Sequence, residues 1–206
     1  WMIVFAGSEK ARTWIMRSGV GIGLGVLVYF KYLNFFIDSF ADLCRMLGLG
    51  AHPKMLQVIL PLGLSFFIFR LISYLIDVQR RKIQAERDFF AFANFVAFFP
   101  SLLSGPIDRP GNFLPQLAQF RSFDMPLAVD GMRQILWGIF KKMVIANNLA
   151  VFVEGMWSSP AGAGLPGMWM AVLLYPLQMY ADFSAYTDMS IGVAKILGIR
   201  IAINFN

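Results

Sequence analysis

The sequence contains almost none of the residues that usually build a soluble catalytic or metal site. In 206 residues it has one cysteine, Cys44, and one histidine, His52. A single cysteine permits no intrachain disulfide and no thiolate metal cluster, and a single histidine leaves little for zinc or imidazole chemistry. Charged residues make up 15% of the chain, against roughly 25% in soluble domains. We therefore predict no metal site in this chain and no disulfide framework.

Apolar residues take the place of the missing charges. They make up 58% of the chain, and its mean hydropathy is +0.62. Many lie in runs long enough to cross a bilayer core of roughly 30 Å, which argues against a secreted, disordered or nucleic-acid-binding domain. The net charge of +6 can indicate a polyanionic partner, but it is also typical of basic cytoplasmic loops, and no basic-aromatic module accompanies it. We therefore predict that the chain partners with the lipid bilayer and binds no nucleic acid.

Two runs in the first third predict membrane spans. Ser18 to Ile37 is apolar except for Lys31, and its length would reach about 30 Å as a helix. Met55 to Ile76 is the second run. Its Arg70 should face protein or a water-filled cavity, because an arginine facing lipid at mid-membrane costs about 2.5–3.5 kcal/mol. Segment 77–88 is more basic than the segment between the runs, so the N-terminal segment and 77–88 are expected in the cytoplasm.

The next run, Phe89 to Ile107, predicts a re-entrant segment rather than a straight span. It carries no charge, but prolines and a glycine interrupt its second half. Backbone that is not helical at membrane depth must be shielded by protein or water. A polar turn follows, and Asn112 to Arg121 is expected to lie at the membrane interface. The residues expected to shape the re-entrant turn are Gly105, Pro106, Asp108 and Arg109.

The second half of the chain predicts two further helices. The first, Gly131 to Val153, carries Lys141 and Lys142, which are neighbours and so point in different directions. They can reach a membrane surface or line a cavity. A loop of small residues is expected at 158–167, followed by a long helix from Met168 to Leu197.

No internal repeat or domain linker is visible in the sequence. Residues 1–206 are therefore interpreted as a single, incomplete membrane domain. The predicted fold class is all-α, a polytopic transmembrane helix bundle with a re-entrant segment.

The main anomaly of the last predicted helix is a group of polar side chains inside an apolar stretch. They fall on two stripes of the helix. One stripe holds Gln178, Asp182 and Tyr186, and the other holds Tyr180, Ser184 and Asp188. Carboxylates inside a membrane are costly unless they are paired or hydrated. From the residues alone, bracing of neighbouring helices, lining of a cavity and direct catalysis all stay open, and all but Tyr180 are candidate site residues.

Other site chemistries find little support in the sequence. It has no Gly-x-Ser-x-Gly elbow for a serine nucleophile, and nothing orients Cys44 and His52 as a nucleophilic pair. A catalytic carboxylate pair must converge in space, and a hard cation needs several oxygen ligands. Spacing alone shows neither for the aspartates of the last helix.

Several motifs give the sequence a family resemblance. The two longest are Phe-Pro-Ser-Leu-Leu-Ser-Gly-Pro-Ile-Asp-Arg at 99–109 and Tyr-Ala-Asp-Phe-Ser-Ala-Tyr-Thr-Asp at 180–188. Further motifs lie, in order along the chain, at 60–65, 73–78, 138–142, 146–149 and 204–206. With them the chain resembles, over most of its length, the bacterial membrane-bound O-acyltransferase (MBOAT) family, in its alginate O-acetylation and teichoic-acid D-alanylation branches. The fold that this resemblance implies is part of the family's helix bundle around a tunnel.

The resemblance implies an enzyme, an O-acyltransferase. Members move an acyl group, here expected to be acetyl, from a cytoplasmic donor to a hydroxyl of an extracytoplasmic polysaccharide or cell-wall polymer. The expected donor is a thioester or an acyl-carrier protein, and no cofactor is expected to stay bound. On the other side, the expected partner is a glycan or a periplasmic acyltransferase. The implied location is the bacterial inner (plasma) membrane, with several passes.

The resemblance also implies roles for individual residues. The family's essential histidines follow the motif at 204–206, so the catalytic histidine is expected beyond Asn206 and this chain alone is expected to be inactive. The polar residues of the last helix would line or brace the tunnel, and the turn at 105–109 would lie near the donor side. Two motifs depart from the usual pattern: Ala185 replaces a glycine in one, and Asp108 with Arg109 in the other is closer to the D-alanylation branch.

Two interpretations from other classes of protein stay open. Buried charges and broken apolar segments also suit a transporter or channel subunit. A catalytically inactive scaffold that recruits a periplasmic partner would retain the motifs without the downstream histidine.

Overall fold

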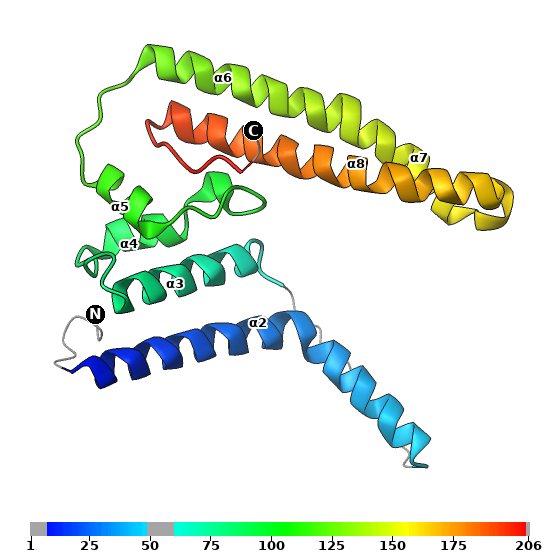
Figure 1. Ribbon diagram of the computed structural model, residues 1–206, viewed down its shortest axis with the longest axis horizontal. Coiled ribbons are helices and arrows are strands. Elements are labelled where there is room, and N and C mark those ends of the chain that lie inside the picture. The colour runs from blue at the N-terminus through cyan, green and yellow to red at the C-terminus, as the bar shows by residue number, and fades with distance from the viewer. Residues whose placement is uncertain (1–7, 49–59, 205–206) are drawn as a thin grey trace. The chain divides into compact units, whose positions relative to one another are not determined.

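The computed structural model describes residues 8–48 and 60–204. All regular structure in these residues is helical, which confirms the all-α prediction (Figure 1). The chain divides into two compact units. The first comprises residues up to Ala97 together with Arg109–Gly111, and the second comprises Phe98–Asp108 and the residues from Asn112 onward.

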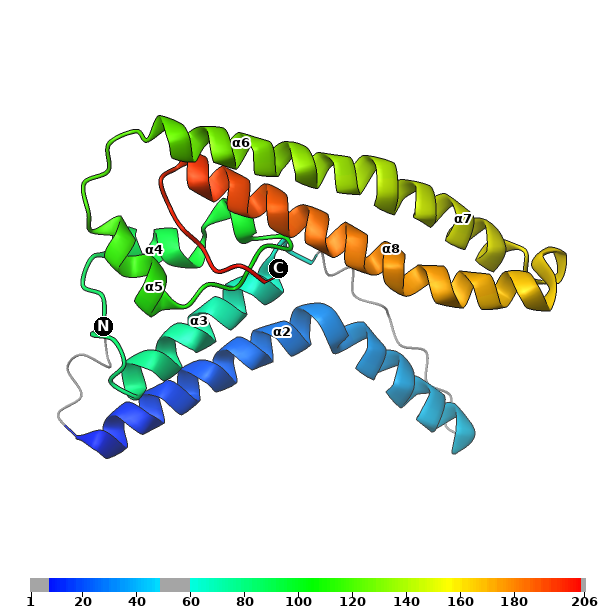
Figure 2. The same cartoon turned by 45° about the horizontal axis from the view of Figure 1, so that its top comes forward.

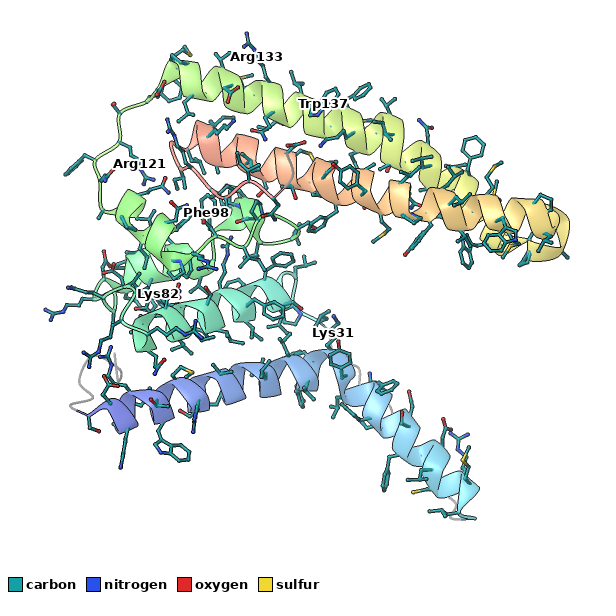
Figure 3. The ribbon with its side chains drawn as sticks, in the orientation of Figure 1. Lys31, Lys82, Phe98, Arg121, Arg133 and Trp137 are labelled. Atoms are coloured by element: carbon teal, nitrogen blue, oxygen red, sulfur yellow. The ribbon has the colours of Figure 1, made fainter. Side chains whose placement is uncertain are left out.

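The first unit contains α2 (Glu9–Met46), α3 (Leu64–Gln79) and α4 (Phe89–Val96). The first half of α2 packs on α3 through glycines. A Cβ on Gly19 would lie 2.7 Å from Leu75 Cδ1, so a larger residue at this position would displace the Leu75 side chain. Beyond this contact α2 bends near Lys31, which Figure 3 labels.

Within residues 8–48 and 60–204, two helical segments are long and apolar enough to cross a membrane, Glu9–Met46 and Met125–Ser158. The first of them contains the predicted span Ser18–Ile37. Only 6% and 11% of their apolar windows are buried, which differs from the mostly buried core helices of soluble proteins. These helices fit a membrane protein, whereas the polytopic bundle stays a prediction.

The second predicted span, Met55–Ile76, begins outside the described residues. Its described part becomes helical only at Leu64, after Gly63 in a left-handed conformation with φ 73°. Arg70 is 1% exposed, and its Nη1 donates a hydrogen bond to Phe95 O at 3.1 Å. The prediction that this arginine faces protein is therefore confirmed.

The second unit is built on a long pair of helical arms. One arm consists of α6 (Met125–Phe140), the π-helix η2 (Lys141–Ala146) and α7 (Asn147–Ser158), and the other is α8 (Pro160–Ile196). Figures 1 and 2 both show the first arm running alongside α8. Two shorter elements come before them in the chain, η1 (Phe99–Ser101) and α5 (Pro110–Leu117). All of η1 belongs to this unit, and so does α5 from Asn112 onward.

The first arm begins earlier than the sequence pattern indicates. The predicted helix starts at Gly131, but α6 starts at Met125, because Asp124 Oδ1 accepts a hydrogen bond from Leu127 N at 3.1 Å and so caps the helix. Proline in the first turn is compatible with this start, since its missing N–H is not needed there.

Small residues bring α6 and α8 into backbone contact. A Cβ on Gly131 would lie 2.6 Å from Gly192 O, and one on Gly138 would lie 2.7 Å from Ala185 O. Within each helix the two contact residues are about two turns apart and so lie on one face. Residues without bulky side chains let two helix backbones approach closely. This interface therefore has no room for a larger residue at either contact.

Two segments differ from the predictions in detail. The run 89–107 is broken as expected, into α4, η1 and non-helical backbone, although its re-entry into a membrane stays a prediction. The segment 158–167, predicted as a loop, is largely helical: a short helical turn begins at Pro160, a kink follows at Gly164 with φ 63°, and the long part of α8 comes after the kink. The small residues of this segment suggested a loop, but a proline such as Pro160 is well suited to the first turn of a helix.

Candidate functional site

A cluster of charged side chains lies in the second unit where the first arm meets α8. Lys141 and Lys142 open η2, and Asp182 and Asp188 lie on α8. Lys141 Nζ pairs with Asp188 Oδ2, and Lys142 Nζ pairs with Asp182 Oδ1. The side chains of Lys141 and Asp188 are only 16% and 19% exposed. These four residues are called the lysine–aspartate cluster below.

Neutral side chains on α8 extend the cluster. Lys141 Nζ donates a hydrogen bond to Ser184 Oγ at 3.1 Å. Lys142 Nζ lies 5.2 Å from the centroid of the Tyr186 ring, a position in which the ring face attracts the cation. Each of the two polar stripes of α8 therefore meets one lysine of the first arm.

Local helix geometry explains how neighbouring lysines reach both stripes. Adjacent residues on a helix point about 100° apart, so the two long side chains leave the first arm in different directions. The backbone contact at Gly138 comes one turn before Lys141, which brings α8 within reach of both ammonium groups. The lysines also open a π-helix, and such segments are rare and occur frequently at functional sites.

The cluster lies far from the charged end of its helix. At that end, Lys195 Nζ pairs with Asp130 Oδ2 at 2.5 Å. Lys141 lies about 16 Å along the helix axis from Asp130, which is about half of a bilayer core of roughly 30 Å. An unpaired charge at such a depth costs about 2.5–3.5 kcal/mol on insertion scales. The two ion pairs leave the cluster with no net charge, which is the arrangement that offsets such a cost.

The cluster is built to hold polar groups in position. Among the residues that the structure describes, no group of three or more His, Cys, Asp or Glu side chains is placed to hold a metal ion. The Ser184 hydroxyl is engaged as well, since it lies 3.3 Å from Ala181 O as a donor. Its contacts are thus with a cation and a carbonyl, neither of which can remove its proton as a general base would.

The loop that follows η1 is fastened to the same part of α8. Ser190 Oγ donates to Pro100 O at 2.6 Å, and Thr187 Oγ1 donates to Ser104 O at 3.4 Å. A Cβ on Gly105 would overlap side-chain atoms of both segments, so the loop backbone lies directly against α8. The stretch of α8 that carries the aspartates therefore also positions this loop.

The predicted residues of the re-entrant turn take different positions. Gly105 and Pro106 are buried in the loop. Asp108 is 3% exposed, and its two oxygens accept from Asn112 Nδ2 at 3.1 and 3.0 Å. Arg109 is exposed and belongs to the first unit. Their role near a donor stays a prediction.

Sequence reasoning missed some of the site's contacts. One is the hydrogen bond that Gln134 Nε2 donates to Asp188 Oδ1 at 3.0 Å. Gln134 lies two turns before Lys141 on the same helix face, and this spacing could have indicated that it belongs to the site. Gln178, a predicted candidate, has a buried Oε1 without a hydrogen-bond partner among the described residues. Ser190 had no comparable signal, because its partner lies about 90 residues earlier in the chain.

Comparison with known proteins supplies the reaction class. No family model matches the chain. The chain is 38% identical over 201 residues to the probable alginate O-acetylase AlgI of Pseudomonas putida, which covers 96% of the chain and 40% of that protein. It is 30% identical over 226 residues to the peptidoglycan O-acetyltransferase of Helicobacter pylori, a match that covers 95% of the chain and 41% of that protein. It is 25% identical over 147 residues to the teichoic acid D-alanyltransferase of Bacillus subtilis, a match that covers 70% of the chain and 37% of that protein.

The chain spans about two fifths of the length of the curated relatives it matches. By their names, these relatives acetylate or D-alanylate a polysaccharide or a cell-wall polymer. The alginate O-acetylases match almost the whole chain, and the two long apolar helices fit a membrane protein. The sequence resemblance is thus confirmed, and the chain belongs to the membrane-bound O-acyltransferase (MBOAT) family.

Proposed function

We propose that this chain is part of a membrane-bound O-acyltransferase that moves an acyl group from a cytoplasmic donor to a hydroxyl of an extracytoplasmic polysaccharide or cell-wall polymer. The observation that carries the assignment is the match to alginate O-acetylases, at 36–38% identity over 96–97% of the chain. The same relatives favour acetyl as the acyl group. Because the chain spans about two fifths of these proteins, the reaction is assigned to the whole protein.

The lysine–aspartate cluster supports a bracing role for this chain within such an enzyme. A tunnel for a polar donor and acceptor needs wall residues whose charges are compensated. The two ion pairs of the cluster tie α8 to the first arm, and α8 in turn holds the loop after η1. We assign the bracing of the tunnel wall to these α8 residues, which are Asp182, Ser184, Tyr186 and Asp188.

The reaction assigned to the whole protein is attack of an acceptor hydroxyl on the carbonyl carbon of a thioester. A C–O bond forms, the C–S bond breaks, and the hydroxyl proton passes through a general base to the leaving thiolate. We assign the base to a histidine outside these 206 residues. The described residues contribute fixed polar groups beside the path.

The proposed location is the bacterial inner membrane, with several passes. The basic segment 77–88 and the start of the chain are assigned to the cytoplasm by the positive-inside rule. A thioester or an acyl-carrier protein would then deliver the acyl group from that side. A glycan, or a periplasmic acyltransferase that serves it, would receive the group on the other side.

A chimera tests the assignment. The match allows this chain to replace the corresponding 201-residue stretch of the Pseudomonas putida alginate O-acetylase. In a strain that lacks its own copy, we expect the chimera to restore acetyl esters on alginate, measured as acetate released by base. A matched chimera with Asp188→Asn loses one ion pair and should restore fewer esters at an equal amount of membrane-inserted protein.

The outcomes separate the proposed function from its alternatives. A chimera that inserts at the parental level but leaves alginate without acetyl esters would contradict an acyltransferase role. Ion or substrate flux through vesicles that contain the protein, without acyl transfer, would favour a transporter. Restored acetylation that is unchanged by Asp188→Asn would support the enzyme and remove the bracing role of the cluster.

A further inference from the structure

A second polar region lies in the first unit, where α2 begins and α3 ends. Arg12 Nη2 donates to Val78 O at 3.0 Å, and Arg81 pairs with Glu9 across the same two segments. These contacts join the start of α2 to the turn after α3, so their charges share one surface. This surface, formed by residues 8–18 and 77–88, is called the basic end below.

The basic end is strongly positive. It holds seven Lys and Arg residues and four Asp and Glu residues, so it carries +3, half of the chain's net charge of +6. Its acids are engaged in local structure: Asp88 Oδ1 caps α4 at 2.8 Å, and Glu86 Oε1 accepts from two backbone amides. Within the described residues, five exposed bases of this surface form no ion pair. They are Lys10, Arg17, Arg80, Arg87 and Lys82, the last of which is labelled in Figure 3.

A recess of about 240 Å³ opens on the basic end. Its lining residues are Glu9, Lys10, Thr13, Trp14 and Arg17. Two cations at one recess suit a phosphate group, because both can donate to its oxygens, whereas the Thr13 hydroxyl already donates to Glu9 O at 3.0 Å. The one carboxylate of the lining is already paired with an arginine of the turn after α3. Trp14 is 70% exposed, as expected for a tryptophan at the level of lipid headgroups.

We propose that the basic end binds the phosphate headgroup of an anionic glycerophospholipid. Clusters of four to eight basic residues beside a membrane-spanning helix attract anionic lipids, and this cluster lies at the start of a helix long enough to span. Lys10 and Arg17 hold the phosphate, and Lys82 and Arg80 add to the attraction from the turn. This site is independent of acyl transfer.

A lipid fits this surface better than an acidic protein does. The recess is bordered by an exposed tryptophan, and the helix continues past it with exposed apolar residues, of which Ile22 is 69% exposed. Acyl chains can lie along such a surface while the phosphate occupies the recess. An acidic protein would use the charges but would leave the apolar border without a partner.

The test measures lipid binding to the purified protein in a mild detergent by native mass spectrometry. The probes are phosphatidylglycerol, phosphatidylcholine and glycerol phosphate without acyl chains. The variant is Lys10→Gln with Arg17→Gln. The matched control, Lys31→Gln with Arg45→Gln, removes the same charge from the same helix away from the recess.

We expect the protein to bind phosphatidylglycerol at least tenfold more tightly than either other probe. One basic side chain near an anionic surface contributes about fivefold in affinity, so the variant should bind phosphatidylglycerol about 25-fold more weakly. The control should stay within about twofold of the unchanged protein, because its residues lie outside the basic end.

Three results would overturn the lipid site. The first is equal affinity for phosphatidylglycerol and phosphatidylcholine. The second is an equal loss in the variant and the control, which would mean that only net charge matters. The third is binding of glycerol phosphate in place of phosphatidylglycerol and dependent on Lys10 and Arg17.

Discussion

Removing one partner of the Lys141–Asp188 ion pair should destabilise the protein more than removing both. The Lys141→Met variant leaves Asp188, 19% exposed, with its hydrogen bond from Gln134 Nε2 at 3.0 Å. Breaking a buried pair in this way costs about 3–5 kcal/mol. Because the carboxylate keeps one donor and some exposure, we expect the lower end of that range, about 3 kcal/mol.

The double variant Lys141→Met with Asp188→Leu removes both charges and replaces them with apolar side chains. Such replacements are often neutral or stabilising, so we expect a loss of about 1 kcal/mol or less in the free energy of unfolding. The Lys195→Met variant is the matched control. Its partner Asp130 is 59% exposed, and exposed pairs are worth about 0–1 kcal/mol.

The assay is reversible unfolding in mixed micelles, followed by far-ultraviolet circular dichroism as the fraction of denaturing detergent rises. The free energies of the single and double variants then form a cycle that isolates the interaction of the two side chains. The reasoning is refuted if the double variant loses the sum of the two single losses, or if Lys141→Met loses no more than Lys195→Met.

Three further predictions concern packing and hydrogen bonds. Gly138→Val should lower the free energy of unfolding by about 1–3 kcal/mol in the same assay, since a Cβ would lie 2.7 Å from a backbone oxygen of α8. The control Gly155→Ala should leave the free energy of unfolding unchanged, because a Cβ there would have no atom within 4 Å. Gln116→Ala should speed hydrogen exchange at the Arg200 amide at least tenfold, because Gln116 Oε1 accepts from that N–H at 2.8 Å; unchanged exchange would contradict the contact. Ser190→Ala removes a 2.6 Å hydrogen bond to the loop after η1, so proteases should cut this loop faster, which limited proteolysis measures.

The sequence predicts the apolar helices well because their signal is local. Length and hydrophobicity alone locate Ser18–Ile37 inside α2, and the cost of a charge in lipid predicts the burial of Arg70. The start of α6 at Met125 was missed, because a cap depends on one side-chain contact rather than on periodicity. The break in 89–107 was foreseen from its prolines and glycine.

The candidate site was predicted only as a set of polar residues. Spacing places Asp182 and Asp188 on two stripes of a helix, but pairing with Lys141 and Lys142 depends on which helix lies opposite, and that register is a tertiary property. The glycines of α6 and α8 set the register, and their contact is visible only once both helices are placed. The sequence indicated that the two aspartates need partners, but only the fold identifies the lysines that pair with them.

The π-helix that begins at Lys141 has a consequence for how this arm tolerates insertions and deletions. A π segment holds one residue more than the α-helix that would otherwise occupy its place. Deleting one residue between Lys141 and Ala146 would restore α-helical hydrogen bonding and would leave α7 in nearly the same orientation, whereas deleting one residue within α7 would turn the rest of that helix by about 100°. Members of the family that lack the segment should therefore be one residue shorter here and still present the same face of α7 to α8.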